Sequence, residues 1–436
     1  MAKINPIINP NLLMINGPVN VIRLEGIIHN VKKIIYLFMD YHIGVNSQTQ
    51  CENIFSKDVQ KYFVDSFYDL NNTKNKYDFF VELYPSELAD ENYKHGISQK
   101  DYKDKYIEEV VKLFRKIFVY DSDKNKVSAN KYFQNMRLHY LDIRDYFKHA
   151  ISNKVFKMAS ISHSFMKNDN VDIEGLEQII KLLDILRDHM VIIVDILEKS
   201  KSNKTNKINK STIKPTIKPT NRSRPRIIKN AKLNKIDEQT LTYLTNKIRS
   251  SYNNSDIKEI MNEMIDESID NFISIIDEID DIIVTFSTYA DDIESQMDKL
   301  IKDHNTSYIF SYGMTPRTMR TMIVDITNTI ENIIEEKFIE FFARFTDIYF
   351  LRRFLDKEYI TNAIVYSGAL HSSTYVSVLV KKFGFRVTHT SYSKVTNMTK
   401  LTDKIRKLPL MEMQELILPP NFLQCSDMTG FPTKFL

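Results

Sequence analysis

One segment near the C-terminus restricts the fold of this chain more than any other. The apolar run Ala363–Tyr366 predicts a buried strand, and Ser367-Gly-Ala-Leu-His371 leads from it into a helix of about ten residues. Gly384 stands where the glycine after a helix belongs, and Phe385–Thr390 predicts a second strand. Strand, helix and strand in this order form a βαβ unit, so we expect parallel strands in a sheet.

The first 150 residues repeat this alternation of short apolar runs and helical patterns. The four expected strands are Val19–Leu24, Lys33–Met39, Tyr77–Tyr84 and Met136–Ile143, and the two expected helices are Ser56–Leu70 and Asp104–Phe118. We expect the first two strands to form a hairpin around Glu25-Gly26. Strands separated by helices of this size again favour a parallel sheet.

The middle of the chain has a helical pattern instead. Asp172 is a suitable N-cap for a helix over 172–199, and Thr315-Pro316 begins another that runs to about Leu355. Asp256–His304 carries Ile and Met on one stripe with acids opposite, which is typical of core packing between long helices. These helices predict an antiparallel pair or a small bundle.

The expected fold class is α/β, with a parallel or mixed sheet, flanking helices and a large α-helical insertion. The sheet domain is discontinuous and takes residues 1–150 and 360–436. The helical insertion takes 151–198 and 236–355, and 199–235 is a basic disordered linker. At 436 residues the chain is long for one domain, which fits this division.

The linker concentrates positive charge. Residues 199–235 hold 13 Lys and Arg and no Asp or Glu, so the rest of a chain of net charge +4 carries −9. The segment reads either as a solvated loop between two helices or as an arm that contacts nucleic acid or another anionic partner. It has no aromatic residue, which argues against base stacking.

Cysteine usage and hydropathy bear on the compartment. Cys51 and Cys425 are the two cysteines, too few for a disulfide framework or a Cys-rich zinc site, so we expect a reducing compartment. The N-terminus lacks the apolar region of a signal peptide, and no run of 18 apolar residues predicts a transmembrane segment. We therefore expect a cytoplasmic location.

Chemistry-bearing side chains fall where four of the expected strands end. They are Asp40 and His42, Glu82, Asp142 and Arg144, and His371. In open α/β sheets ligands bind outside the carboxyl ends of the strands, so these groups are expected to meet at one edge. His42 is the candidate general base, and His371 completes the cluster.

The remaining candidates have supporting roles. Asp40 and Glu82 orient His42 or activate water, and Asp142 and Arg144 are further candidates, the Arg for an anionic group of the substrate. Asp40, His42, Glu82 and His371 are also the candidate ligands of a divalent metal. Each has a structural alternative: a turn cap for Asp40, a loop histidine for His42 and an ion pair for Asp142 with Arg144. Glu82 lies in a buried-type strand, where a carboxylate must be paired or functional.

The order of these motifs resembles a known superfamily. A strand leads to Met39-Asp40-Tyr41-His42, a later strand ends in Glu82, and the late strand is followed by Gly368-Ala-Leu-His371. This is similar to the superfamily of TIKI/TraB-like proteins, erythromycin esterase-like hydrolases and ChaN-like haem-binding proteins, whose first motif is usually Gly-Glu-x-His. The resemblance covers about a quarter of the chain, and it implies an α/β fold that serves either hydrolysis, with or without a metal, or binding.

A second resemblance concerns the source. The composition and the run Ile34–His42 look like proteins of giant DNA viruses of amoebae, which would place the chain in the host cytoplasm or the virion.

The sequence lacks the complete motifs of several other enzyme classes. Asp40-x-His42-x-Gly44 could open a two-metal phosphoesterase, but the two further segments that such enzymes need are absent, as are Walker A, Rossmann, His-Glu-x-x-His and Gly-x-Ser-x-Gly patterns. Cys51 is too isolated to be taken as a nucleophile.

Two hypotheses of function follow. The leading one is a hydrolase that uses the Asp40, His42, Glu82 and His371 cluster on a small molecule or a peptide. The alternative is a non-catalytic viral interaction protein or virion-associated protein that uses its long helices and the basic arm over 199–235.

Overall fold

The structure is a computed structural model of the chain. It describes residues 9–43, 51–82, 105–115, 117–118, 120–121, 126–127, 130–202, 233–249, 252–302, 314–421 and 423–435. The chain divides into two compact units. The first comprises Met1–Ile143, Tyr252–Ile260 and Tyr349–Leu436, and the second Arg144–Ser251 and Met261–Ile348. The first is α/β and the second helical, so the expected fold class is confirmed.

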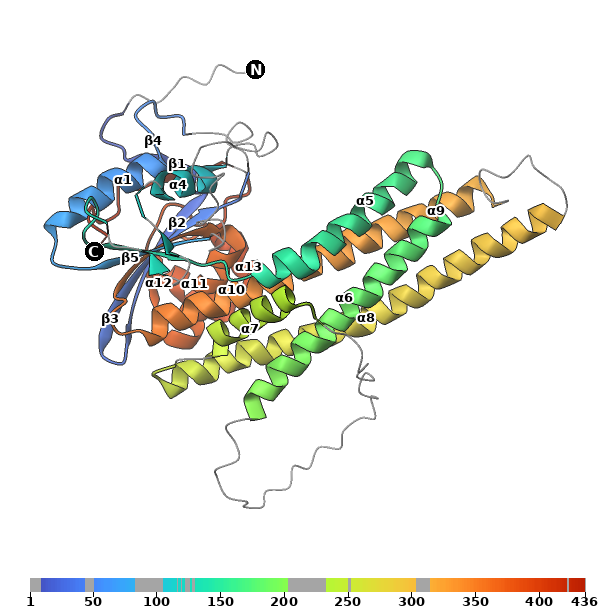
Figure 1. The fold of residues 1–436 in the computed structure, drawn as a ribbon. Helices are drawn as coiled ribbons and strands as arrows, with labels where there is room; N and C mark the ends of the chain where they lie inside the picture. The colour runs from blue at the N-terminus through green and yellow to red at the C-terminus, as the bar shows by residue number, and fades with distance from the viewer. Residues whose placement is uncertain are drawn as a thin grey trace. The chain divides into compact units, whose positions relative to one another are not determined.

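The α/β unit is built on a six-stranded mixed sheet (Figure 1). The order of its strands is β10-β2-β3-β9-β5-β8. The strands are β2 (Asn20–Ile28), β3 (Val31–Asp40), β5 (Tyr77–Val81), β8 (Met136–Tyr140), β9 (Asn362–Gly368) and β10 (Arg386–Thr390). β2 runs against the other five strands. The carboxyl ends of β3, β9, β5 and β8 therefore lie at the same edge.

The βαβ unit expected near the C-terminus is present as β9, α11 (Ala369–Phe383) and β10. Gly384 ends the helix in the left-handed conformation, with φ +68°. β10 is parallel to β9 but is not its neighbour, because β2 and β3 lie between them. The crossover therefore encloses the N-terminal hairpin, which joins the two ends of the chain in one sheet.

The turn of that hairpin is not where the sequence placed it. β2 continues through Glu25-Gly26 to Ile28, and the turn falls on His29 and Asn30, both with positive φ. Gly26 is needed for packing: a Cβ at this position would come within 2.5 Å of the ring of Phe385. A glycine in a strand can mark either a turn or a close approach of another segment, and Gly26 marks a close approach.

Both faces of the sheet are covered by apolar side chains. On one face Phe63 and Phe67 of α1 (Val59–Asp69) pack against Phe79, with ring centroids 5.0 and 4.9 Å away, and α4 (Tyr106–Arg115) adds Phe114. The opposite face is covered by α11 and by Phe350, whose ring lies 5.1 Å from that of Phe80. The expected helices and strands are thus confirmed in type, with shifts of a few residues at their ends.

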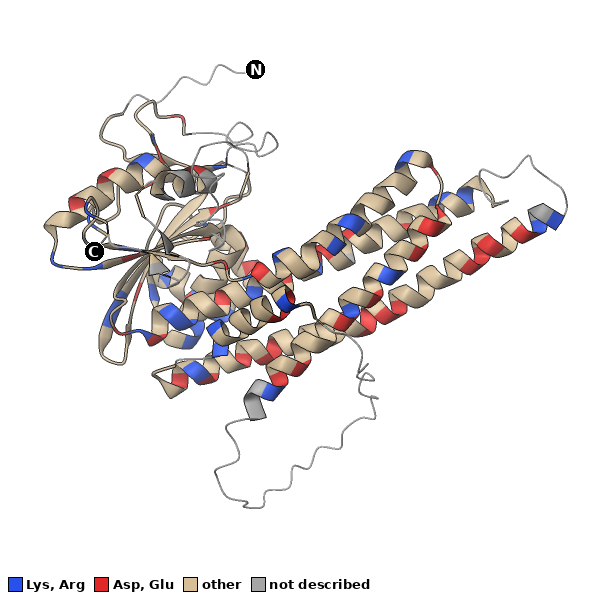
Figure 2. Cartoon of the chain, viewed as in Figure 1, with Lys and Arg blue, Asp and Glu red and all other residues tan. Residues whose placement is uncertain are grey.

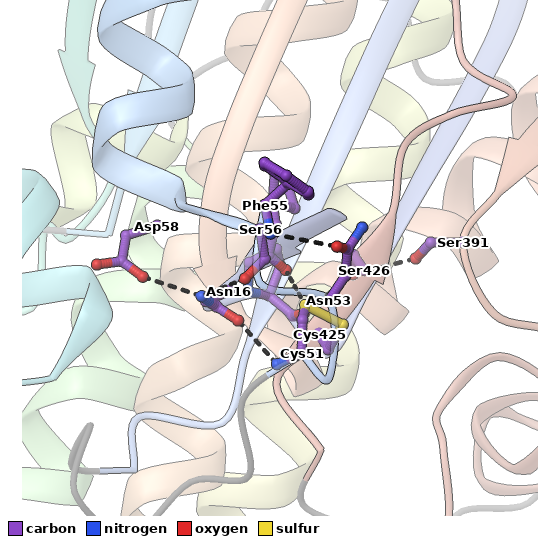
Figure 3. Close-up of a disulfide and its surroundings, with 11 residues drawn as sticks. Asn16, Cys51, Asn53, Phe55, Ser56, Asp58, Ser391, Cys425 and Ser426 are labelled. Carbon is purple, nitrogen blue, oxygen red and sulfur yellow. Dashed lines mark hydrogen bonds between the residues drawn. A yellow bond between two sulfur atoms is a disulfide. The ribbon is translucent and has the colours of Figure 1, made fainter. Parts of the chain in front are cut away.

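A small three-stranded sheet, of order β11-β1-β4, holds the two ends of this unit together. Its strands are β1 (Met14–Asn16), β4 (Lys57–Asp58) and β11 (Cys425–Asp427). Beside it a disulfide joins Cys51 to Cys425, which are 374 residues apart in the sequence (Figure 3). Two cysteines are too few for a framework of several disulfides, but Cys51 and Cys425 form one disulfide. The disulfide removes the argument by which we expected a reducing compartment, and the cytoplasmic location stays a prediction.

The second unit consists of long helices, confirming the helical pattern of the middle of the chain. They are α5 (Asn153–Asn168), α6 (Ile173–Ser202), α7 (Lys235–Arg249), α8 (Ser255–Lys302), α9 (Pro316–Asn328) and α10 (Glu336–Asp356), with π-helical segments at Phe147–Ser152 and Thr329–Glu335. α8 and α10 each extend into the α/β unit at one end. Asp172 caps α6 by accepting the Gly175 N–H at 2.7 Å, and Thr315 caps α9.

Burial and charge separate cleanly along α8. Its buried side chains include Met261, Ile265, Phe272 and Ile276, whereas Asp and Glu occupy the remaining faces along its length (Figure 2). Within the described part of the chain, no helix is long and apolar enough to cross a membrane.

Some predictions fall on residues that the structure does not describe. These are residues 203–232 of the basic segment, Gly44, and the expected element ends at 83–85, 104 and 303–304. The described ends of the basic segment are helical, because α6 continues to Ser202 and α7 begins at Lys235.

Candidate functional site

Three of the expected site residues converge at the carboxyl edge of the sheet. His42 follows β3, Glu82 follows β5, and His371 is the third residue of α11, directly after β9. β9 lies between β3 and β5, so three neighbouring strands deliver the three side chains. Glu82 Oε2 lies 3.4 Å from His42 Nε2, and Glu82 Oε1 lies 3.3 Å from His371 Nε2. The carboxylate therefore stands between two imidazoles.

Glu82 is the centre of this cluster. Its side chain is 11% exposed, and its Oε2 accepts the backbone N–H of Gly368 at 2.8 Å. Burial alone would raise the pKa of this carboxyl, but His371 and His42 outweigh burial and hold the pKa well below its usual value. Glu82 is thus an anion at neutral pH, fixed at the N-terminus of α11, where a negative charge is favoured.

His42 is the member that solvent reaches, with 35% of its side chain exposed. Its backbone has φ +55°, a conformation uncommon outside glycine, and its N–H donates to Asp40 Oδ1. Its Nδ1 lies 3.8 Å from the same oxygen. Burial lowers the pKa of His42, but Glu82 and Asp40 outweigh burial, so the net pKa is raised. Such a held backbone conformation is typical of functional sites.

Asp40 supports His42 from below the surface. It is 1% exposed, and its Oδ2 accepts a hydrogen bond of 2.5 Å from the hydroxyl of Tyr366. Burial raises the pKa of Asp40, although His42 and Tyr366 act in the opposite direction. The pKa of Tyr366 lies well above its usual value, first because it is buried and then because Asp40 is beside it. The sequence analysis did not single out Tyr366, although a tyrosine in a buried strand usually needs a partner for its hydroxyl.

Gly368 makes room for the cluster. A Cβ at this position would lie 2.8 Å from His42 Nε2 and 3.3 Å from Glu82 Oε2. Only glycine leaves space for the imidazole and the carboxylate to approach the backbone here. The late motif Gly368-Ala-Leu-His371 thus contributes its glycine as well as its histidine.

Asp142 and Arg144, the two further candidates, follow β8, the edge strand beside β5. Asp142 is buried just after β8, where the preceding Leu141 N–H donates to Val81 O at 2.9 Å. Arg144 belongs to the helical unit. The roles expected of these two residues stay predictions.

The four candidate metal ligands do not fit a metal ion. Among the residues that the structure describes, no group of three or more His, Cys, Asp or Glu is placed to hold one. The reason is local: Asp40 uses its two oxygens for the His42 N–H and the Tyr366 hydroxyl, and Glu82 faces the Gly368 N–H and both imidazoles. The arrangement suits proton transfer between side chains instead.

A second buried cluster, near the amino ends of β5 and β8, was missed by the sequence analysis. Asp78 is fully buried, and its carboxylate lies 2.6 Å from Arg137 Nη2 and 2.7 Å from His139 Nε2. Arg353 Nη2 lies 3.3 Å from His139 Nδ1. Burial lowers the pKa of His139. The signal was present, since Asp78 interrupts an apolar strand just as Glu82 ends it.

The comparisons with known proteins give a family and its viral source. A family described as "Family of unknown function (DUF5847)" matches residues 13–436. Uncharacterized protein R706 of Acanthamoeba polyphaga mimivirus is 52% identical over all of both chains. Proteins R161 and R160 of the same virus, also named as uncharacterized, are each 35% identical; the first match covers 98% of this chain and 99% of R161, the second all of both chains. The expected resemblance to proteins of giant DNA viruses of amoebae is confirmed. No solved structure matches.

Proposed function

The chain belongs to the DUF5847 family of unknown function, and we propose that the cluster of His42, Glu82, His371 and Asp40 is the acid–base site of a hydrolase. One observation carries the proposal: His42, the exposed member, stands between two carboxylates that raise its pKa. An imidazole tuned toward neutral pH is the usual general acid or base. The proposal includes the resemblance of the motifs at Asp40, Glu82 and His371 to those of TIKI/TraB-like and erythromycin esterase-like proteins, a superfamily that contains hydrolases.

The proposed roles follow from the contacts. Neutral His42 takes a proton from a water molecule, whose oxygen attacks the electrophilic centre of a small-molecule or peptide substrate. Ionised Glu82 stabilises the resulting imidazolium, which then gives its proton to the leaving group. His371 holds the other oxygen of Glu82, and Asp40 holds the backbone of His42. No step in this scheme needs a metal ion.

The test compares variants on a panel of fluorogenic esters, amides, peptides and phosphoesters. His42→Ala and Glu82→Gln should each reduce turnover by about 100-fold or more, because general acid–base catalysis contributes about that much. His149→Ala is the matched control, since His149 is an exposed histidine of the helical unit. Wild-type protein that turns over no member of the panel, or His42→Ala protein that matches the control, would contradict the proposal.

The alternative proposal is a non-catalytic viral interaction or virion-associated protein. The observation that favours it is the mutual satisfaction of the cluster, because Glu82 and Asp40 already have partners within the fold. The long helices and the basic arm over 199–235 would then bind partners, nucleic acid among them. Under this alternative, deletion of residues 203–232 abolishes binding to a labelled oligonucleotide, binding by the intact chain falls steeply with salt, and the histidine variants keep their partners.

A further inference from the structure

We propose that a pocket at the end of β10 binds a small molecule that carries a protonated amine on a short apolar body. The pocket lies in the α/β unit and has a volume of about 310 Å³, within the range of ligand pockets. It is formed by the second half of β10, by Met398 at the start of α12 (Met398–Lys407), and by the chain from Asp427, the last residue of β11, to Phe431. The proposal is independent of the hydrolase proposal, since it uses no residue of the His42 cluster.

A β-bulge in β10 places two neighbouring side chains on the same side of the strand. β10 pairs Val387 with Leu24 and His389 with Arg23, so Thr388 is an extra residue between the two pairs. Side chains normally alternate along a strand, and a bulge interrupts that alternation. Arg23 Nη1 accordingly donates to Thr388 Oγ1 at 2.5 Å, and His389 Nδ1 lies 3.1 Å from the same oxygen. β10 is an edge strand of its sheet, and bulges at sheet edges commonly redirect a side chain in this way.

His389 offers a hydrogen-bond acceptor to the pocket. Thr388 donates its one hydroxyl proton to Arg23 O at 3.2 Å, so Nδ1 of His389 is the donor to Thr388. The lone pair is then on Nε2, for which the described residues provide no partner. Burial, and then Arg23, lower the pKa of His389, so the ring is neutral at pH 7 and keeps this acceptor.

Apolar side chains line the pocket beside the imidazole. The ring centroid of Phe431 lies 5.4 Å from that of His389, and Met398 lines the pocket from α12. Gly430 lines it from the turn before Phe431, and a Cβ at this position would meet no atom within 4 Å. The backbone therefore leaves space here, and the apolar body of a ligand packs against Phe431 and Met398.

Asp427 supplies the negative charge. Its Oδ1 accepts the Thr429 N–H at 2.8 Å, and the described residues give its Oδ2 no partner. The positive charge of the nearby Arg23 is offset by Glu25, whose carboxylate lies 3.5 Å from it. The pocket thus presents a carboxylate and a neutral acceptor. A protonated primary amine has one positive charge and three N–H donors, so it satisfies both groups.

A metal ion is the other kind of cation that a carboxylate and an imidazole attract. Metal ions in proteins usually need more ligands than these two. In the described parts of the chain, no group of three or more His, Cys, Asp or Glu is placed to hold one. A metal ion also makes no use of Phe431 and Met398, whereas an organic amine does.

The pocket is held in shape without a ligand, because a buried asparagine fixes the end of β10. Oδ1 of Asn20 accepts the hydroxyls of Thr390 and Ser391 at 3.1 and 2.8 Å. Ser391 Oγ also lies 3.1 Å from Oγ of Ser426, which directly precedes Asp427 (Figure 3). The two walls of the pocket are therefore tied to each other, so binding orders few side chains.

The experiment titrates full-length protein at pH 7 with benzylamine and, separately, with benzyl alcohol, and follows the imidazole of His389 by NMR. The two compounds have nearly the same size, but only benzylamine is charged. Benzylamine should bind about twofold to fivefold more tightly, because an ion pair at an exposed carboxylate contributes about this much. The bound cation should also lower the pKa of His389 further. Equal affinities, or saturation that leaves the His389 signals unchanged, overturn the proposal.

One variant tests the charge. Asp427→Asn keeps the size of the side chain and should bind benzylamine no more tightly than benzyl alcohol. The matched control is Asp403→Asn, which removes an exposed carboxylate of α12 that pairs with Arg406 at 3.1 Å, and it should keep the preference for the amine. A preference that persists in Asp427→Asn protein, or that the control loses equally, contradicts the proposal.

A second variant tests the acceptor. His389→Phe keeps a ring beside Phe431 and removes Nε2, so it should weaken the binding of benzylamine by about threefold to tenfold, as the loss of one hydrogen bond does. An unchanged affinity would overturn the assignment of His389.

A further probe separates a small molecule from a protein partner, because a lysine side chain carries the same charged group. The amide of N-acetyl-lysine should bind more weakly than benzylamine, since its apolar stem is thinner than an aromatic ring. Tighter binding of the lysine amide would overturn the assignment of the pocket to a small molecule.

Discussion

Two buried polar clusters lie on the same sheet, and they are built differently. Near the amino ends of the strands, Asp78 is held by Arg137 and His139 at 2.6 and 2.7 Å, and His139 has a lowered pKa. At the carboxyl edge, Glu82 lies 3.4 Å from His42, which has a raised pKa and is 35% exposed. The first cluster keeps its histidine buried and resistant to protonation, whereas the second keeps a histidine accessible and inclined to protonation.

The difference teaches that burial of charge alone does not mark a functional site. Short, directly hydrogen-bonded pairs with a buried histidine fit a structural role. Longer contacts, an exposed imidazole and a positive φ at His42 fit a site where a proton moves. The following variants test whether the two clusters differ in this way.

The largest effect is expected at the amino-end cluster. Asp78→Ala should lower the free energy of unfolding by about 3–5 kcal/mol, because it removes a fully buried carboxylate that is paired with Arg137 and with the largely buried His139. Urea denaturation measures it. The control is Asp65→Ala, whose carboxylate pairs with Lys57 and Lys61 at the surface and should cost less than about 1 kcal/mol. Equal effects of the two variants would show that the Asp78 cluster is not structural.

A smaller loss of stability is expected at Gly368, where the cluster at the carboxyl edge leaves little space for a side chain. Gly368→Ala places a Cβ against His42 Nε2, so it should cost about 1–3 kcal/mol and move the imidazole away from Glu82. The matched control is Gly430→Ala, where no atom lies within 4 Å of the added Cβ. Denaturation and the His42 pKa are measured together. A His42 pKa that is unchanged in Gly368→Ala protein would contradict the geometry of the site.

Removal of one hydroxyl should have a smaller effect again. Tyr366→Phe deletes the donor to Asp40 Oδ2 and should cost about 1 kcal/mol. It should also raise the pKa of Asp40 further, since this hydrogen bond favours the charged carboxylate. The carboxyl titration of Asp40, followed by NMR, checks the direction. A lowered pKa would mean that the hydroxyl does not support the anion.

The pH dependence of stability should separate the two histidines by sign. The pKa of His42 is raised, so its contribution is present below about 6.5 and is lost as the pH rises through the folded value. The pKa of His139 is lowered, so its contribution is present above about 6.5 and is lost as the pH falls through the folded value. His42→Gln should flatten the alkaline side of the profile, and His139→Gln the acidic side. Flattening on the same side in both variants would remove the distinction.

The sequence was sufficient to predict the strands and the residues at their ends. Short apolar runs end in Asp40, Glu82 and the loop before His371, and the carboxyl ends of parallel strands meet at one edge. The sequence therefore predicted that these side chains lie at one edge of the sheet, but not which of them are neighbours. The strand order was not predictable, because β9 enters between β3 and β5 from the far end of the chain.

Two further features depended on the tertiary fold, and a third was overlooked in the sequence. The hairpin turn at His29 and Asn30 was hidden because Gly26 looked like a turn residue but packs against Phe385. The disulfide was hidden by its long sequence separation. The Asp78 cluster could have been predicted from the rule applied to Glu82, that a carboxylate in a buried strand needs a partner.

The most direct test of the account is the pKa of His42 in the oxidised wild-type protein, measured by NMR titration with His139 as the internal reference. The account predicts a value above about 6.5 for His42 and below it for His139. A His42 pKa at or below that of His139 would contradict it, because the two carboxylates would then not act on the exposed imidazole.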